Sequence, residues 1–584
     1  MLADKDLVSI QEVRSKVEKA YAAWQKYRSY SQEQVDTIVE QMAAAARAAS
    51  QQLAELAVEE TGYGNAKDKL AKNLLCADLL PRRMRGMKTI GVLRELPEEK
   101  LVEIGVPVGV VAAILPTTNP TSTAIYKTLI SLKAGNSVVL SPHPNAKKCT
   151  CETAAILYQA AVAAGAPEDI IQCINTPTLE ATNALMRHDR TGVILSTGGH
   201  GIVKAAYSSG KPAFGVGPGN VPVMLERTAD VAEAVRMVVE GKSFDFGTVC
   251  SSEQALVAEE SLRDRTIAEL KARKAYFCNE SQKEALAKLL LTPSWTVNPK
   301  CVGQPAPKIA KMAGFDVPAD TPILVVELSG VGKQHPLSAE KLSPVLSLYI
   351  VKDFAAGLDI CESLLRFGGL GHTCVIHSKD DARIREYGLR MPAFRVLVNT
   401  SAPQGSTGIT TNIMPSMTLG CGAMAGNITS DNIGPLHLIN IKRIAYVARR
   451  PEDAFESAPP QAAAASTVDR GTIVSAVERY LASRGVTTAG APAAKSPVTD
   501  VVSSVVDRFL ATRKSGVASS VATTPVATKP VETSAPAIVT FVCENDVREA
   551  IRDSRKIYIG PKTIVTPSAR DLGDQFGILV LAQR

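Results

Sequence analysis

Strand-like and helix-like runs alternate along the middle of this chain, and this alternation restricts the fold more than any other feature. Short apolar runs such as VGVVAAIL, NSVVL, DIIQCI and GVILS follow one another from residue 106 onward. Longer runs with helical spacing, such as TSTAIYKTLISLKA and CETAAILYQAAVAAG, separate them. This order is typical of a doubly wound α/β fold, in which helices cover both faces of a parallel sheet.

Segments with other patterns help to divide the chain into domains. Residues 8–60 are alanine-rich with helical periodicity, which predicts packed helices. KTIGVLRELPEEKLVEIGVPV, residues 88–108, has two extended halves around a Pro-Glu-Glu turn and predicts a hairpin that pairs with another subunit. We place a first α/β domain at residues 1–228, a second at 229–420, and a return to the first at 421–450.

The composition changes at about residue 451, where Ala, Pro, Ser and Thr become dominant. Such segments bury too little apolar surface to order themselves, so residues 451–535 are interpreted as a flexible extension. Two islands in it, 471–484 and 498–513, carry apolar residues at helical spacing and predict short amphipathic helices. The linkers around them favour an outside partner over packing on the helices' own domain. Residues 536–584 regain strand and helix character and predict a small module with a structural or docking role.

Composition and charge exclude several classes of protein. The 65 basic and 58 acidic residues give a net charge of +7 without a basic block interleaved with aromatics, so we expect no nucleic-acid partner. Apolar runs stop short of the ~20 residues of a membrane helix, and the first residues lack a secretory pattern, so we expect a cytoplasmic protein. The 11 cysteines have no C-x-x-C spacing. We expect neither a disulfide framework nor a metal site, even at the pair Cys149 and Cys151.

One cysteine differs from the others in its neighbours. Cys250 lies in FDFGTVCSSEQ, residues 244–254, behind a glycine and among small and hydroxylated residues. Catalysis by a thiol needs a thiolate, donors for the oxyanion of the attacked carbonyl, and a partner for the second half-reaction. A single cysteine is more often a small buried apolar residue, so Cys250 alone does not predict catalysis.

Six motifs in a fixed order change this interpretation. They are GVPVGVVAAILPTTNPTSTAIYKTLISLKAGNSVVLSPHP, FGVGPGNVPVMLERTADVAEAV, FDFGTVCSSEQALV, EKLSPVLSLYIV, FGGLGHTCVIHS and TLGCGAMAGNITSDNIGPLHLINIKRIAY. Over residues 5–450 the chain resembles the coenzyme-A-acylating branch of the aldehyde dehydrogenase superfamily. It is most similar to the propionaldehyde and acetaldehyde dehydrogenases of bacterial microcompartments and to the aldehyde half of bifunctional alcohol dehydrogenases. The resemblance implies a Rossmann-like NAD-binding domain and an α/β catalytic domain.

The resemblance also assigns catalytic roles. It implies that Cys250 is the nucleophile and that Asn119, in PTTNPT, supplies the side-chain amide of an oxyanion hole; a plain turn residue before Pro120 is the alternative. One such donor is worth roughly 3 kcal/mol. His372, in GLGHTC, matches a catalytic histidine of the branch. We expect it in a glycine-flanked loop, exposed and titrating near neutral pH, with a purely structural role as the alternative.

The cofactor residues are expected at the ends of strands, because no G-x-G-x-x-G follows a strand in the usual way. One set of expected cofactor residues follows the strand NSVVL. Another follows the strand GVILS and precedes a helix whose N-terminus suits pyrophosphate. The resemblance adds a carboxylate for the nicotinamide ribose from EKLSPV. The predicted set is Ser141, Pro142, His143, Thr197, Gly198, Gly199, Glu340 and Pro344. Ser141 stands where hydrolytic relatives usually carry a lysine, which leaves the choice between NAD and NADP open.

An absent residue predicts the reaction. Hydrolytic aldehyde dehydrogenases place a glutamate general base in E-L-G-G, whereas this chain reads GVGPGN at 215–220. Without that carboxylate water is poorly activated, and the acyl group waits for a thiol. The resemblance implies NAD-dependent oxidation of propionaldehyde or acetaldehyde to acyl-CoA, through a cysteine thiohemiacetal and thioester, with coenzyme A as co-substrate. The alternatives are a hydrolytic aldehyde dehydrogenase, a phosphate-substrate reductase of the same superfamily, and a degenerate enzyme that acts as a cargo scaffold.

The extension indicates where such an enzyme works. Microcompartment members of the branch carry a short amphipathic helix on a flexible linker, which docks on shell proteins or neighbouring cargo. Both islands fit this description, which predicts a cytoplasmic location within a bacterial microcompartment and shell or cargo proteins as partners. The hairpin and the strand NIKRIAYVA suit pairing between subunits, so we expect a homodimer or homotetramer.

Overall fold

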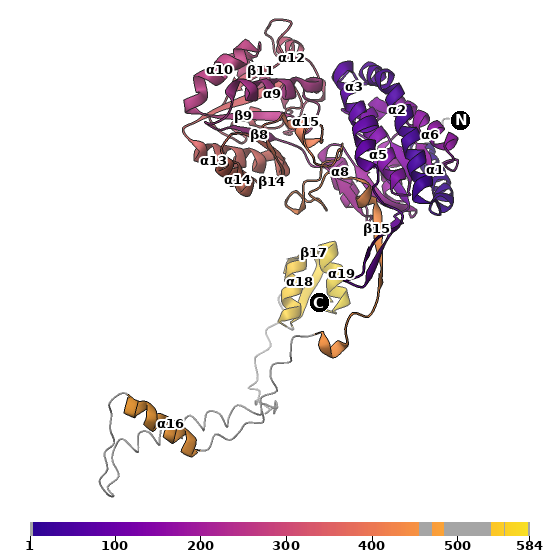
Figure 1. Ribbon diagram of the computed structural model, residues 1–584, viewed down its shortest axis with the longest axis vertical. Helices are drawn as coiled ribbons and strands as arrows, with labels where there is room; N and C mark the ends of the chain where they lie inside the picture. The colour runs from indigo at the N-terminus through magenta and orange to yellow at the C-terminus, as the bar shows by residue number, and fades with distance from the viewer. Residues whose placement is uncertain (1–3, 455–469, 484–538, 554, 582–584) are drawn as a thin grey trace. The chain divides into compact units, whose positions relative to one another are not determined.

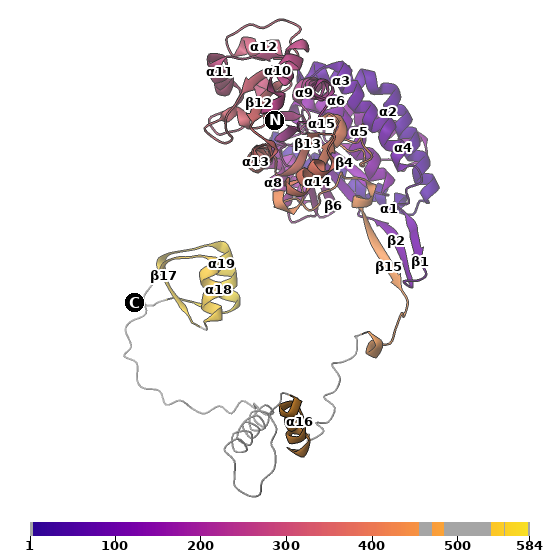
Figure 2. The same ribbon diagram turned by 60° about the vertical axis from the view of Figure 1, so that its left-hand side comes forward.

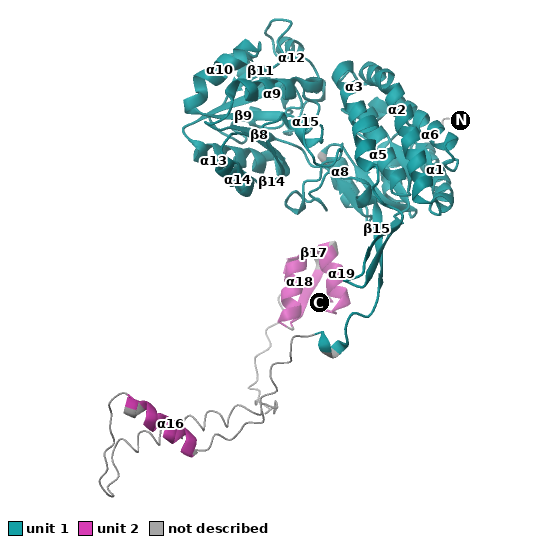
Figure 3. Cartoon of the chain, viewed as in Figure 1, with its two compact units in different colours: residues 1–457 teal, residues 458–584 magenta. Residues whose placement is uncertain are grey.

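The computed structural model describes residues 4–454, 470–483, 539–553 and 555–581. Two compact units make up the chain, unit 1 at Met1–Ser457 and unit 2 at Ala458–Arg584 (Figure 3). Unit 1 contains both large sheets, and the described residues of unit 2 contain the helix α16 and a small terminal sheet with two helices. No helix among the described residues is long and apolar enough to cross a membrane.

Unit 1 begins with the predicted packed helices. These are α1 (Lys5–Tyr27) and α2 (Gln32–Thr61), followed by α3 (Ala66–Leu74) and α4 (Leu80–Met84). Ser31 starts α2 with a capping box, in which its hydroxyl accepts from the Gln34 backbone and the Gln34 side chain accepts from the Ser31 backbone. A left-handed Gly62 ends the same helix.

The first sheet has five parallel strands in the order β5-β4-β3-β6-β7 (Figure 1). They are β3 (Val110–Ile114), β4 (Ser137–Ser141), β5 (Ile171–Cys173), β6 (Thr191–Ser196) and β7 (Ala213–Gly215). Its helices are α5 (Pro120–Lys133), α6 (Lys147–Ala163), α7 (Leu179–Arg187) and α8 (His200–Tyr207). Val111 packs in a core with α2, α5 and α6, whereas Ala112 packs with α1 and α7. Helices therefore cover both faces, as the alternating pattern predicts.

The second sheet has seven parallel strands in the order β10-β11-β12-β9-β8-β13-β14. The strands are β8 (Val221–Leu225), β9 (Glu253–Glu259), β10 (Tyr276–Phe277), β11 (Leu324–Glu327), β12 (Val345–Val351), β13 (Gly371–His377) and β14 (Ala393–Val398). The helices are α9 (Val231–Ser243), α10 (Arg263–Ala272), α11 (Glu280–Leu290), α12 (Ala306–Met312), α13 (Phe354–Leu364), α14 (Asp381–Arg390) and α15 (Ala402–Ser406). Because β8 already belongs to this sheet, the chain changes sheets before the expected boundary at residue 228.

A third, antiparallel sheet projects from the rest of unit 1 (Figures 1 and 2). It contains β1 (Gly91–Leu96), β2 (Leu101–Pro107) and β15 (Ile439–Ala445), in the order β1-β2-β15. β1 and β2 form the predicted hairpin. β15 carries exposed apolar side chains, among them Ile441 and Ile444.

Unit 2 contains one of the two predicted amphipathic helices, α16 (Arg470–Ser483). The other, at 498–513, lies outside the described residues. The terminal module is a parallel three-stranded sheet of order β16-β17-β18 with two helices. Its elements are β16 (Val539–Val542), α18 (Glu544–Arg552), β17 (Ile557–Val565), α19 (Pro567–Gln575) and β18 (Leu579–Leu581). The recovery of strand and helix character predicted for this region is confirmed.

Candidate active site

Cys250 lies directly after a strained turn that leads into β9. The 3₁₀ turn η3 (Phe244–Gly247) contains three consecutive residues with positive φ, Asp245 at 47°, Phe246 at 53° and Gly247 at 75°. Left-handed backbone is costly for an aromatic residue such as Phe246 and is held only by surrounding structure. A Cβ on Gly247 would lie 2.9 Å from the Ser343 backbone, so this turn also needs a glycine for space. The motif FDFGTVC therefore encodes a tight turn that fixes Cys250.

Three segments far apart in the sequence meet around Cys250. A Cβ added to Gly219 would lie 2.0 Å from the Cys250 carbonyl oxygen and 3.4 Å from Cδ2 of His372. The Gly219 backbone N–H donates to Oε1 of Glu340 at 3.1 Å. Cys250, His372 and Glu340 thus surround Gly219, and the structure brings together three residues that the sequence analysis had selected separately.

The electrostatic surroundings of Cys250 keep its thiol protonated. Burial, together with the nearby Glu340 carboxylate, raises the pKa of Cys250 to about 12. Burial likewise raises the pKa of Glu340 to about 8. Near neutral pH both groups are therefore mostly protonated, and forming the thiolate requires a proton acceptor.

His372 differs from its expected environment. It lies in β13 rather than in an exposed loop, with no exposed surface, because the segment after Gly371 extends the second sheet. Its Nδ1 lies 2.9 Å from the Thr373 hydroxyl, and its Nε2 has no hydrogen-bond partner. Burial and then the positive charge of Arg395 hold the pKa of His372 well below its usual range. The expectation that it titrates near neutral pH is wrong, because the imidazole is neutral there.

Asn119 stands at the start of α5, at the C-terminal side of β3. It is 9% exposed, and its side chain does not cap the helix. The amide nitrogen donates to the Thr118 hydroxyl at 3.0 Å, and the amide oxygen accepts from Nζ of Lys72 at 2.5 Å. The second N–H of this amide has no partner among the hydrogen bonds of the described residues.

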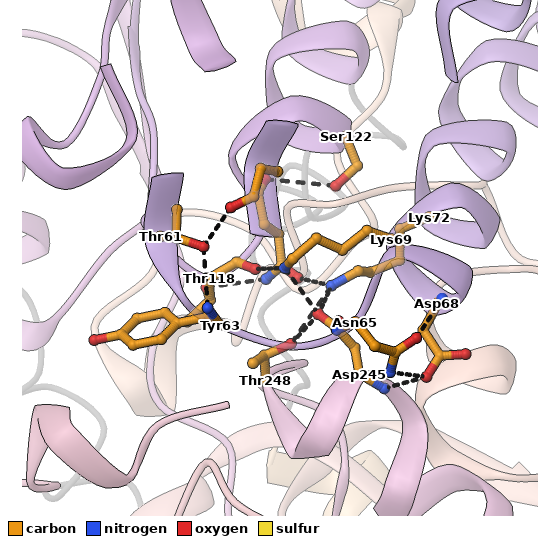
Figure 4. A network of polar contacts seen from close by, with 12 residues as sticks. Thr61, Tyr63, Asn65, Asp68, Lys69, Lys72, Thr118, Ser122, Asp245 and Thr248 are labelled. Atoms are coloured by element: carbon orange, nitrogen blue, oxygen red, sulfur yellow. Dashed lines mark hydrogen bonds and ion pairs between the residues drawn. The ribbon is translucent and has the colours of Figure 1, made fainter. Parts of the chain in front are cut away.

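Sequence reasoning missed a buried ionic cluster behind these residues (Figure 4). Lys69 and Lys72, on α3, both form ion pairs with the carboxylate of Asp245, and all three side chains are at most 3% exposed. Asp245 could have been selected from the sequence, because it belongs to the motif FDFGTVC. Nothing in the sequence marks the two lysines as functional, because DKLAKN resembles any amphipathic helix segment.

The predicted cofactor residues fall into three groups. The first group, Ser141, Pro142 and His143, lies at the end of β4. The second group, Thr197, Gly198 and Gly199, follows β6, and these two strands flank β3 in the sheet. Such strand ends are where open parallel sheets bind ligands. Gly199 precedes α8 without a side-chain cap and faces open space, so the first N–H groups of α8 suit a phosphate. The third group is split, because Glu340 lies beside Gly219 while Pro344 is buried where its carbonyl accepts from the Leu324 backbone.

A cavity of about 560 Å³ adjoins the site. Gly217 and Pro218, which precede Gly219, form part of its wall. Lys204 of α8 and Arg366 bring positive charge to it. Other lining residues come from the loop at 425–427. Its volume is within the range of small-molecule and cofactor pockets, and its cationic groups suit a phosphorylated ligand.

The described part of the chain holds no group of three or more His, Cys, Asp or Glu side chains able to bind a metal ion. What the site contains is a thiol, amide and backbone N–H donors, an imidazole and a carboxyl group. This set is suited to covalent catalysis by attack of Cys250 on a carbonyl carbon.

Comparison with known proteins identifies similar chains. A sequence model described as the aldehyde dehydrogenase family matches residues 2–284. The bifunctional aldehyde-alcohol dehydrogenase of Escherichia coli (strain K12) is 44% identical over 444 residues, which cover 75% of this chain and 50% of that protein. The chain thus spans about half the length of this curated relative.

Solved structures are similar over the same region. An acetylating aldehyde dehydrogenase from Geobacillus thermoglucosidasius shares 50% identity with a TM-score of 0.76, over 77% of this chain and 99% of that one. A propionaldehyde dehydrogenase from the fucose utilisation bacterial microcompartment of Clostridium phytofermentans shares 28% identity with a TM-score of 0.67, over 74% of this chain and 97% of that one.

Proposed function

The chain belongs to the aldehyde dehydrogenase family, and from this premise we propose that it oxidises a short aldehyde to an acyl-CoA thioester with NAD. Propionaldehyde and acetaldehyde are the proposed substrates, and coenzyme A is the second substrate. The names of two similar solved structures, an acetylating aldehyde dehydrogenase and a propionaldehyde dehydrogenase, support this choice.

The observation that carries the proposal is the lack of a carboxylate in GVGPGN, residues 215–220, the segment that stands where hydrolytic relatives carry a glutamate base in E-L-G-G. Its first residue, Gly215, has no room for a larger side chain, because a Cβ there would lie 2.6 Å from Cγ1 of Val203 and 2.8 Å from Cε2 of Tyr207. Without a carboxylate there, water is a poor nucleophile toward a thioester, and a thiol that ionises more readily has the advantage.

In the proposed reaction Cys250 attacks the aldehyde carbon and forms a thiohemiacetal. The Asn119 amide and the Cys250 backbone N–H stabilise the alkoxide that develops on the aldehyde oxygen. NAD, when bound, supplies the acceptor for the hydride that leaves this carbon. The acyl group then remains on Cys250 as a thioester until the coenzyme A thiol attacks it, with another alkoxide in the same position. Collapse of this alkoxide breaks the bond to the Cys250 sulfur, which leaves as the thiolate and releases acyl-CoA.

His372 is proposed as the proton acceptor for the thiol groups. The imidazole is unprotonated near pH 7, and its Nε2, which has no other partner, is the atom proposed to accept the proton. The site fits a dinucleotide through the free N-terminus of α8 and through the Glu340 carboxyl. The cationic cavity beside Pro218 suits the phosphates of coenzyme A or NAD.

Absorbance of NADH tests this function directly. Purified protein with propionaldehyde and NAD is expected to form NADH only when coenzyme A is present, and Cys250→Ala is expected to abolish it. Steady NADH formation without coenzyme A would instead indicate hydrolysis to a free acid. Absence of turnover under every condition would favour the cargo-scaffold alternative.

Location within a bacterial microcompartment in the cytoplasm is proposed from the C-terminal extension. The amphipathic helix α16 and the similarity to a microcompartment enzyme support docking on shell or cargo proteins. Deleting residues 457–535 is expected to leave activity unchanged and to abolish co-sedimentation with shells. A truncated enzyme that still co-sediments would contradict this docking role.

Pairing of subunits is proposed at the projecting sheet. β15 extends the hairpin and exposes Ile441 and Ile444, and the next residue after the strand, Tyr446, is exposed as well, which suits contact with a second copy. A homodimer or homotetramer is therefore proposed, and its mass in solution, measured by light scattering, is the test.

A further inference from the structure

A single lysine connects the turn before Cys250 to the amide proposed for the oxyanion hole. Nζ of Lys72 lies 2.5 Å from Oδ1 of Asn119 and 3.4 Å from the Thr248 hydroxyl, and it forms an ion pair with Asp245. Asp245 and Thr248 are both within five residues of Cys250. Figure 4 shows Lys69 and Lys72 directed from α3 toward these two residues.

The position of Lys72 is over-determined by its neighbours. Lys69 and Lys72 lie three residues apart, on one face of α3. The Asp245 carboxylate accepts from both ammonium groups, from the Thr248 hydroxyl and from the backbone N–H of Asn65. Burial would raise the pKa of Asp245, but the charges of Lys72 and Lys69 outweigh it and lower that pKa. Asp245 is therefore a fixed anion that holds Lys72 in place.

This contact acts on Asn119 in two ways. The amide oxygen is bound to a cation, so the amide cannot flip, and its nitrogen must face the other way. One N–H of that nitrogen donates to Thr118, which leaves one for another acceptor. A positive charge on the oxygen also draws electron density from the nitrogen, which makes the remaining N–H a stronger donor.

We propose that Lys72 is a positioning residue that orients and polarises the Asn119 amide toward the oxyanion formed when Cys250 attacks the substrate. This proposal rests on the function proposed above, in which Asn119 is an oxyanion donor. Asp245 takes part by fixing Lys72, and it couples the Cys250 turn to the donor.

The charge of Lys72 makes the proposal measurable as a pH effect. Burial lowers the pKa of Lys72 to about 8. The carboxylates of Asp245 and Asp68 act to raise this pKa, and the charge of Lys69 acts to lower it further. Burial raises the pKa of the Cys76 thiol, on which the charge of Lys72 also acts, so that thiol stays protonated. Lys72 therefore loses its positive charge as the pH rises through about 8, and the oxyanion donor weakens.

The test compares three variants with the wild type in single-turnover NADH formation at saturating coenzyme A. Lys72→Met is expected to lower the rate constant about tenfold or more. Lys72→Arg, which keeps the cation, is expected to retain most of the rate and to move the alkaline decline of the pH profile upward. Lys69→Met is the matched control, because it breaks a similar ion pair to Asp245 without touching Asn119. It is expected to change the rate constant much less than Lys72→Met.

Alkylation of Cys250 by iodoacetamide separates positioning from general damage, because this reaction forms no oxyanion. Lys72→Met is expected to be alkylated at close to the wild-type rate. Three results would each overturn the proposal. The first is an equal loss of alkylation and turnover in Lys72→Met, and the second is an equal effect of Lys69→Met and Lys72→Met on the rate constant. The third is an unshifted pH profile in Lys72→Arg. A wild-type protein without coenzyme-A-dependent turnover would overturn the proposed function itself.

Discussion

Gly219 and Cys250 lie in closer contact than any residue with a side chain would allow. A Cβ on Gly219 would stand 2.0 Å from the carbonyl oxygen of Cys250, and the Gly219 N–H donates to Glu340. The GPGN segment thus sets the distance between the cysteine turn and the carboxyl group.

Gly219→Ala is expected to force the cysteine turn away from β8 and to lower turnover at least tenfold. The nearest atoms to that Cβ belong to the Cys250 backbone, which cannot move aside as a flexible side chain would. Gly217→Ala is the matched control, since its Cβ would make an ordinary 3.7 Å contact with Sγ of Cys421. Steady-state rates of both variants provide the measurement. Equal activity of the two would contradict the prediction.

Glu340→Gln is expected to speed the alkylation of Cys250 by iodoacetamide above about pH 8. The negative charge of Glu340 helps to raise the pKa of Cys250, so its removal lowers that pKa and increases the thiolate fraction. Below about pH 8 Glu340 is itself mostly protonated, so the variant and the wild type are expected to react alike there. The exposed Glu327→Gln serves as control. Identical rates for Glu340→Gln and wild type at every pH would show that this charge does not reach the thiol.

His372→Ala is expected to lower acyl transfer to coenzyme A at least tenfold, because it removes the neutral imidazole proposed to accept the thiol proton. The pH profile of the wild type is expected to show no decline attributable to this histidine between pH 5 and pH 8, a range of about three units in which histidines usually titrate. His377→Ala, in the same strand, controls for loss of a buried imidazole. Unchanged steady-state and single-turnover rates in His372→Ala would remove it from the mechanism.

Oxidation by hydrogen peroxide is expected to join Cys151 and Cys173. Their sulfur atoms lie 2.6 Å apart, between α6 and the end of β5, and a disulfide needs about 2.05 Å. The Cys173 thiol and the positive charge of Lys16 lower the pKa of Cys151, which favours it as the first thiol oxidised. Peroxide converts one thiol to a sulfenic acid, and the other thiol displaces water from it.

Mass spectrometry of peptides from the Cys250→Ala protein detects this disulfide. The peptides that contain Cys151 and Cys173 then appear linked, with a mass lower by two hydrogen atoms than the sum of the two. A reducing agent is expected to reverse it, and Cys151→Ser to prevent it. Recovery of Cys151 and Cys173 as two separately alkylated thiols after peroxide treatment would contradict the prediction.

Local patterns in the sequence were sufficient to predict the elements of the fold. Period and composition depend on neighbours a few residues apart, so the runs NSVVL and GVILS indicated β4 and β6, and the Pro-Glu-Glu turn indicated the hairpin of β1 and β2. Cys250 and Asn119 were selected because they lie in motifs that resemble a known family. Periodicity alone would not have distinguished either of them.

Only the tertiary structure decided the surroundings of those residues. Lys72 lies 173 residues from Asp245 and 47 from Asn119, and nothing in the segment DKLAKN reveals these partners. His372 was expected to be exposed because glycines flank it, but the second sheet pairs β13 with β8 and β14 and buries it. The sequence by itself determined which elements form and which motifs they carry. The packing of distant segments determined the pKa values and hydrogen bonds of the site, because these depend on neighbours that local patterns do not contain.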